Sequence, residues 1–128
     1  MTYYFAKTLA LPFDQAVTRT REALALKGFG VITEIDIAKT LKAKIGVDFR
    51  PYLILGACNP RMAHQALSME DKVGTMLPCN VVVQELKPGQ VEVAAIDPAA
   101  SMQAIENKKL REVAGEVGAL LKAAVESL

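Results

Sequence analysis

Two cysteine-containing turns are the part of this sequence best suited to chemistry. The first is Ala57-Cys58-Asn59-Pro60 and the second is Leu77-Pro78-Cys79-Asn80, and together they hold both cysteines of the chain. The one histidine, His64, lies between them in the sequence. A thiol can act as a nucleophile, a redox group or a ligand for a soft metal. The residues that we take as candidate ligand contacts are therefore Cys58, Asn59, His64, Cys79 and Asn80.

Cys58 is expected directly before the N-terminus of a helix. Asn59 is a good N-cap acceptor, and Pro60 suits the first helical position because an N–H there would have no partner within the helix. The free N–H groups and the positive end of the helix dipole favour an anion. We therefore expect a lowered pKa for the Cys58 thiol, which would make Cys58 a reactive or ligand-contacting group.

The two cysteines also have a structural interpretation. Most free cysteines behave as small buried hydrophobes, and Cys58 and Cys79 fit that description as well as the functional one. A disulfide between them is a third alternative, which a reducing compartment disfavours. If the strands that carry them are neighbours, both cysteines lie at the same end of the sheet.

The polar candidate residues also have structural interpretations. Asn59 and Asn80 are a helix cap and the first residue of a strand, although an amide beside each thiol can also orient a ligand. His64 is expected at the border of its helix or in solvent. A metal site of Cys58, His64 and Cys79 would supply suitable ligands, but it requires the two cysteines to meet. The methionines could line a soft apolar groove, although such residues usually serve packing. These are Met62, Met69, Met76 and Met102.

Alternating strand and helix patterns position these residues. Apolar runs and period-two alternation predict strands over residues 2–9, 29–35, 52–57, 80–86 and 91–96. The run from Tyr52 to Ala57 has no polar alternation, which predicts burial on both faces. Helical spacing and cap residues predict helices over 13–27, 37–45, 60–69 and 108–128, with a helical turn over 98–102 and a loop over 70–76. Pro88-Gly89 predicts a type II turn between the last two strands.

This order of elements, β-α-β-α-β-α-β-β-α, predicts an α+β fold. The hairpin fixes one antiparallel pair, so we expect helices packed on a mostly antiparallel sheet of about five strands. At 128 residues with 52% hydrophobic content, the chain is expected to form a single domain over residues 1–128.

Composition also limits the classes of function. The net charge of +1 is spread along the chain, and only 5% of residues are aromatic, so we expect no binding to nucleic acid or to a membrane surface. No signal peptide and no run of membrane-spanning length is visible, which favours a cytoplasmic protein. No Ser-His-Asp order, P-loop or dinucleotide-binding glycine pattern is present. The sequence therefore assigns no catalytic residue or dedicated metal ligand and leaves any cofactor unknown.

The residues around the two turns resemble the family called domain of unknown function 302. The resemblance rests on Tyr52 to Pro60, on Ala63 and Ala66-Leu67, on Leu77 to Val81 and on Asp97-Pro98, and it extends over nearly the whole chain. It implies a TATA-box-binding-protein-like α+β domain with a curved antiparallel sheet, commonly paired as a homodimer. A likeness of fold does not imply DNA binding, because function belongs to sites.

Three functional classes follow. The one that we favour is a non-enzymatic homodimeric module that binds a small ligand, a sulfur species or a metal, near Cys58 and Cys79. The second is a thiol-dependent redox protein or enzyme in which Cys58 acts as the thiolate and Cys79 resolves it. The third is a structural or assembly protein without a ligand site.

Overall fold

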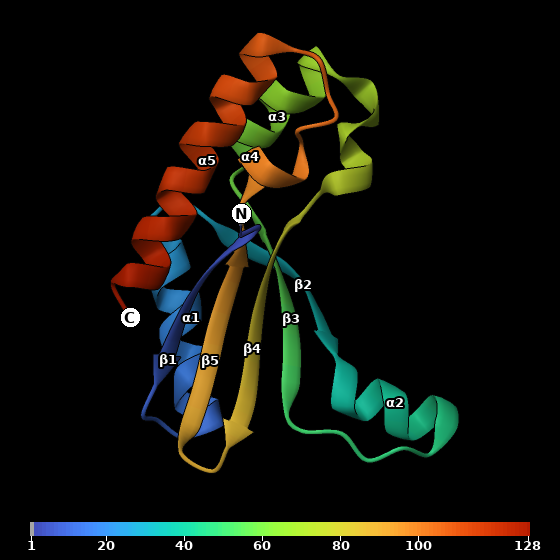
Figure 1. Ribbon diagram of the computed structural model, residues 1–128, viewed down its shortest axis with the longest axis vertical. Helices are drawn as coiled ribbons and strands as arrows, with labels where there is room; N and C mark the ends of the chain where they lie inside the picture. The colour runs from blue at the N-terminus through green and yellow to red at the C-terminus, as the bar shows by residue number, and fades with distance from the viewer. Residues whose placement is uncertain (1) are drawn as a thin grey trace.

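The computed structural model describes residues 2–128 and shows an open antiparallel sheet with helices packed on it (Figure 1). The strand order is β1-β5-β4-β3-β2, and every neighbouring pair is antiparallel. The predicted α+β class and the five strands are therefore confirmed. The elements are β1 (Tyr4–Leu9), α1 (Phe13–Leu26), β2 (Gly30–Asp36), α2 (Ile37–Ile45), β3 (Tyr52–Cys58), α3 (Pro60–Met69), η1 (Asp71–Met76), β4 (Cys79–Lys87), β5 (Gln90–Ile96), α4 (Pro98–Ser101) and α5 (Lys108–Glu126).

Helices α2 and α5 begin where the sequence predicts, each directly after a capping residue. The Asp36 side chain accepts a hydrogen bond from the Lys39 backbone N–H at 2.9 Å, and α2 stops at Gly46, whose φ is 69°. Asn107 caps α5 in the same way through the Leu110 N–H, at 3.1 Å. None of the helices in the described part of the chain has the length and apolar content that crossing a bilayer requires.

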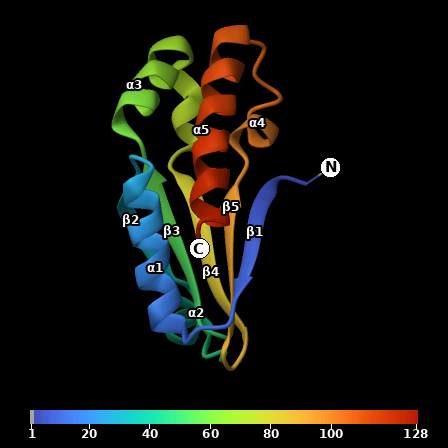
Figure 2. The same ribbon diagram turned by 90° about the vertical axis from the view of Figure 1, so that its left-hand side faces the viewer.

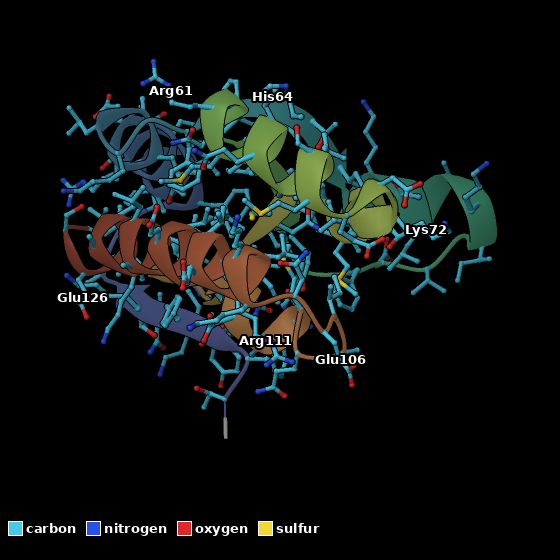
Figure 3. The ribbon with its side chains drawn as sticks, turned by 90° about the horizontal axis from the view of Figure 1, so that it is seen from above. Arg61, His64, Lys72, Glu106, Arg111 and Glu126 are labelled. Atoms are coloured by element: carbon cyan, nitrogen blue, oxygen red, sulfur yellow. The ribbon has the colours of Figure 1, made fainter. Side chains whose placement is uncertain are left out.

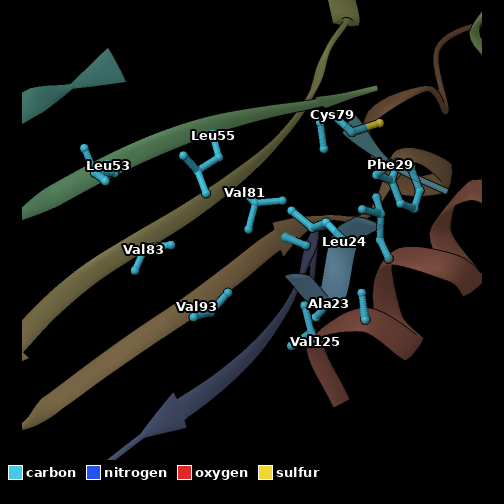
Figure 4. Close-up of a cluster of buried hydrophobic side chains, with 14 of the residues drawn as sticks. Ala23, Leu24, Phe29, Leu53, Leu55, Cys79, Val81, Val83, Val93 and Val125 are labelled. Carbon is cyan, nitrogen blue, oxygen red and sulfur yellow. The ribbon is translucent and has the colours of Figure 1, made fainter. Parts of the chain in front are cut away.

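The main core lies between one face of the sheet and the helices α1 and α5, which both appear in front of the sheet in Figure 2. Alternate residues of the central strands point into it, and Figure 4 shows Leu55, Val81 and Val93 facing Leu24 of α1. All four side chains are at most 2% exposed. Full burial of such a side chain contributes about 1.5–3 kcal/mol, so this layer provides most of the driving force for folding.

The prediction that β3 is buried on both faces is wrong. Leu53, Leu55 and Ala57 are buried, whereas Tyr52 and Ile54 on the opposite face are only half-buried. The reason is that α1 and α5 cover the same side of the sheet, whereas its other side is flanked by α2 and is not covered by α1 or α5. We call that uncovered side the open face.

The segment after α3 is a 3₁₀ helix, η1, where the sequence predicted a loop. Its Val73 side chain is fully buried in a second, smaller core cluster together with Met102 and Leu110. One buried apolar residue in a polar segment gives no periodic signal, which explains why the sequence pattern did not predict a helix here. A register shift between Val31 and Thr33 also interrupts the alternation predicted for β2.

Candidate functional site

A cavity of about 370 Å³ lies where the end of β3 and the start of β4 meet α3 and α5. Figure 3 looks down on this end of the molecule, where α3 and α5 lie side by side. We call it the β3–α3 cavity. Its wall includes Phe29, Ile32, Ala57, Cys58, Asn59, Met62, Ala63, Ala66, Leu77, Pro78, Cys79, Met102, Leu110, Val113, Ala114 and Val117.

The strand register brings the two cysteine turns together. Ala57 of β3 lies opposite Cys79 of β4, so Cys58 is one residue beyond the position that faces Cys79. Both cysteines are free thiols, and both line the cavity. β3 and β4 are neighbours, which is the condition set from the sequence, and the two cysteines lie at the same end of the sheet.

The turn at Cys58 has the predicted local structure. Asn59 caps α3, because its side-chain oxygen accepts a hydrogen bond from the Met62 N–H at 3.2 Å, and Pro60 is the first helical residue. Cys58 is the last residue of β3 and is half-buried. This geometry holds the thiol in the cavity wall at the start of a helix, while the Asn59 amide serves the backbone.

Cys79 has a more enclosed environment than Cys58. Its side chain is 8% exposed and belongs to the main core cluster, where Figure 4 shows it beside Phe29. Burial raises the pKa of the Cys79 thiol from its ordinary value of 9.0 to about 11, and the nearby Cys58 adds to the rise. Cys79 therefore stays protonated at neutral pH and acts as a small apolar wall group.

The other polar candidates lie outside the cavity. His64 is exposed on the outer side of α3, away from α5 (Figure 3), and Asn80 is exposed at the start of β4. The metal site of Cys58, His64 and Cys79 is therefore not assembled. Across residues 2–128 no three His, Cys, Asp or Glu side chains lie close enough together to hold a metal ion.

Helix α5 supplies a wall that the sequence analysis assigned only to the core. Val113, Ala114 and Val117 lie on its buried stripe and line the cavity. The stripe itself was predictable, but a helical period does not show which part of a buried face meets a void. Two of the four methionines singled out from the sequence, Met62 and Met102, also line the cavity.

The wall is almost entirely apolar. No charged side chain in the described chain lines the cavity, and Asn59 provides its one amide. Ligand sites typically combine such an apolar lining with a few polar groups. A charge placed here would lose its hydration without a partner, which is costly, so the wall favours an uncharged occupant.

Comparison with known proteins identifies a family, and solved structures are also similar to the chain. Residues 5–128 match the family model described as Domain of unknown function DUF302. The chain is also similar to the crystal structure of an uncharacterized conserved protein DUF302 from Bacillus stearothermophilus, with 27% sequence identity and a TM-score of 0.90 over 98% of each chain. No curated protein sequence matches the chain.

Proposed function

The chain belongs to the DUF302 family, and from that premise we propose that it is a non-enzymatic, homodimeric, cytoplasmic module that binds a small uncharged ligand in the β3–α3 cavity. The observation that carries the proposal is the cavity itself. Its volume of about 370 Å³ lies within the range of roughly 300–1,000 Å³ that is typical of small-molecule sites. Two free cysteines, Cys58 and Cys79, suit the reducing cytoplasm.

The chemistry of the wall indicates a soft, polarizable ligand. Four sulfur-containing residues line the cavity among aliphatic side chains. Thioethers and thiols are polarizable and pack favourably against aromatic and sulfur-containing groups. We therefore propose an uncharged sulfur-containing or aromatic molecule as the ligand. The four residues are Cys58, Met62, Cys79 and Met102.

The alternative of a thiol enzyme receives less support. In that function Cys79 would resolve a species formed on Cys58, which requires an ionised, accessible thiol. Cys79 is 8% exposed, and its pKa is raised to about 11. A group that stays protonated and enclosed resolves slowly, so the arrangement favours binding over turnover.

Titration calorimetry with methyl phenyl sulfide tests the proposal. This probe is uncharged, carries one thioether and cannot exchange with a thiol. We expect wild-type protein to bind it and to reject benzoate, which has a similar size but carries a charge.

Two matched variants, each with an alanine replaced by leucine, locate the binding site. Ala63→Leu fills the cavity from a half-buried wall position, and Ala119→Leu makes the same change on the exposed side of α5. We expect Ala63→Leu to weaken binding about tenfold, which is about 1.4 kcal/mol, and Ala119→Leu to leave it unchanged. Absence of binding to wild type, or equal binding by both variants, would overturn the proposal.

A further inference from the structure

An apolar row crosses the whole open face of the sheet. The strand register pairs Ala6 with Ala94, Ala94 with Val82, Val82 with Ile54, and Ile54 with Ile35. These five residues share the face opposite the core, because their neighbours along each strand are the ones that point toward α1 and α5. The row is therefore continuous from one edge strand to the other.

Within residues 2–128 this row is incompletely covered. Ile35 is 47% exposed, and Val82, Ile54 and Ala94 are half-buried. Large exposed apolar patches on soluble proteins mark interaction sites. The open face is therefore a candidate surface for a partner.

Helix α2 forms a wall beside the open face. Figures 1 and 2 show it on the opposite side of the sheet from α1 and α5, projecting beyond β2. It has no buried residue of its own. Ile45 at its end is 67% exposed, and Val47 and Phe49 in the following loop are also exposed. An amphipathic helix whose apolar face is only partly buried gains stability by packing on another surface.

We propose that the open face and α2 together form the interface with a second copy of this chain. The inference deepens the homodimer of the proposed function and rests on it. β4 is the middle strand of five. In the dimer the open faces of two sheets face each other, and the two-fold axis runs between them, parallel to β4. This axis stacks β5 on the partner's β3 and β1 on the partner's β2. The apolar row then packs on itself, and each α2 lies along the exposed β1 edge of the other copy.

The charges on the open face match this arrangement. The Arg50 side chain donates to the Gln84 side-chain oxygen at 2.9 Å, and the Gln84 amide donates to Glu92 at 3.1 Å. Arg50 and Glu92 thus lie on either side of Gln84, which is on the central strand. The two-fold axis places Arg50 of one copy against Glu92 of the other, twice per dimer.

These two charges are available for such a contact. Within residues 2–128 neither Arg50 nor Glu92 takes part in an ion pair with another side chain of the same chain. Arg50 is held in place, because its guanidinium carbon lies 4.4 Å from the centre of the Phe49 ring. Complementary charges of this kind fix the register of an interface more than they add affinity.

Sedimentation velocity of the full chain tests the apolar part of the interface. We expect a dimer at micromolar concentration for wild type. Val82→Glu should weaken dimerisation about a hundredfold, because the charge would be buried at the centre of the interface. Leu26→Glu also replaces an apolar residue with Glu, at an 84% exposed position of α1 on the other side of the sheet, and should leave the dimer intact. Circular dichroism verifies that both variants are folded.

Charge reversal tests the register. Arg50→Glu and Glu92→Arg should each weaken self-association, because each places like charges together at both contacts. An equimolar mixture of the two variants should dimerise again, since both opposite-charge contacts are restored only between different copies. A monomeric wild type, a dimer insensitive to Val82→Glu, or variants whose mixture dimerises no better than they do alone would overturn the interface.

The titration with methyl phenyl sulfide distinguishes a failure of the proposed interface from a failure of the proposed function. A folded, monomeric Val82→Glu variant that still binds methyl phenyl sulfide shows that the cavity works without the interface. A dimer that fails to bind the probe shows the reverse.

Discussion

Cys58 and Cys79 share one cavity wall but have different surroundings. Cys58 ends β3 at the start of α3 and is half-buried, whereas Cys79 is enclosed by the main core. From the sequence, their common end of the sheet was a hypothesis that required the two strands to be neighbours, and β3 and β4 are paired. The sequence did not predict which thiol is enclosed, because that depends on α1 and α5 packing over β4, and strand periodicity contains no information on such a long-range contact.

The raised pKa of Cys79 predicts a loss of stability in alkaline solution. The unfolded chain loses this proton near pH 9, but the folded protein holds it until about pH 11. The folded state therefore binds more protons within this window. The contribution of Cys79 is complete below pH 9 and is lost as the pH rises toward 11, by about 2 kcal/mol.

Urea unfolding under reducing conditions near pH 8 and near pH 10.5 measures this loss. Other groups also titrate in this range, so the comparison is with Cys79→Ala, which lacks the thiol. The variant should be less stable near pH 8 but should lose about 2 kcal/mol less than wild type on going to high pH. Equal losses for the two proteins would show that burial does not hold the Cys79 proton.

Among the elements, β3 lies close to both β2 and the turn before β4 at Gly56, where the side chains of Thr33 and Pro78 approach the glycine. A Cβ at this position would lie 1.9 Å from Thr33 Oγ1 and 2.6 Å from Pro78 Cγ. Both distances are too short for any side chain, and the neighbours belong to two different segments. Glycine at position 56 therefore lets the Pro78 turn close over the end of β3, beside the cavity.

Gly56→Ala is expected to destabilise the protein by about 1–3 kcal/mol, because overpacking forces the Thr33 and Pro78 segments apart. Gly115→Ala is the matched control. It lies in α5 with no atom near a Cβ, so it should be neutral or stabilising by up to about 1 kcal/mol. Chemical denaturation of both variants gives the two values, and equal effects would contradict the close approach.

Most elements were predictable because local chemistry specifies them. Asp36 and Asn59 cap their helices as their residue types predict, and Gly89, at a φ of 78°, turns the hairpin. The 3₁₀ helix η1 and the open face of β3 were not predicted. Both depend on which faces α1, α4 and α5 cover, which is decided by tertiary packing.

At the scale of the whole molecule, the two faces of the sheet have different roles. One face packs on α1 and α5 and ends in the β3–α3 cavity, while the open face carries an uncovered apolar row. A soft uncharged ligand could in principle adhere to either apolar surface. If the β3–α3 cavity is the binding site, the ligand contacts the cavity wall and not the open face.

Intermolecular NOEs between methyl phenyl sulfide and ¹³C-labelled methyl groups test that position most directly. The methionine methyls of Met62 and Met102 report on the cavity, and the isoleucine methyls of Ile35 and Ile54 report on the open face. We predict NOEs from the probe to both methionines and none to the two isoleucines. NOEs to the isoleucines alone, or to neither set, would contradict the assignment of the cavity as the ligand site.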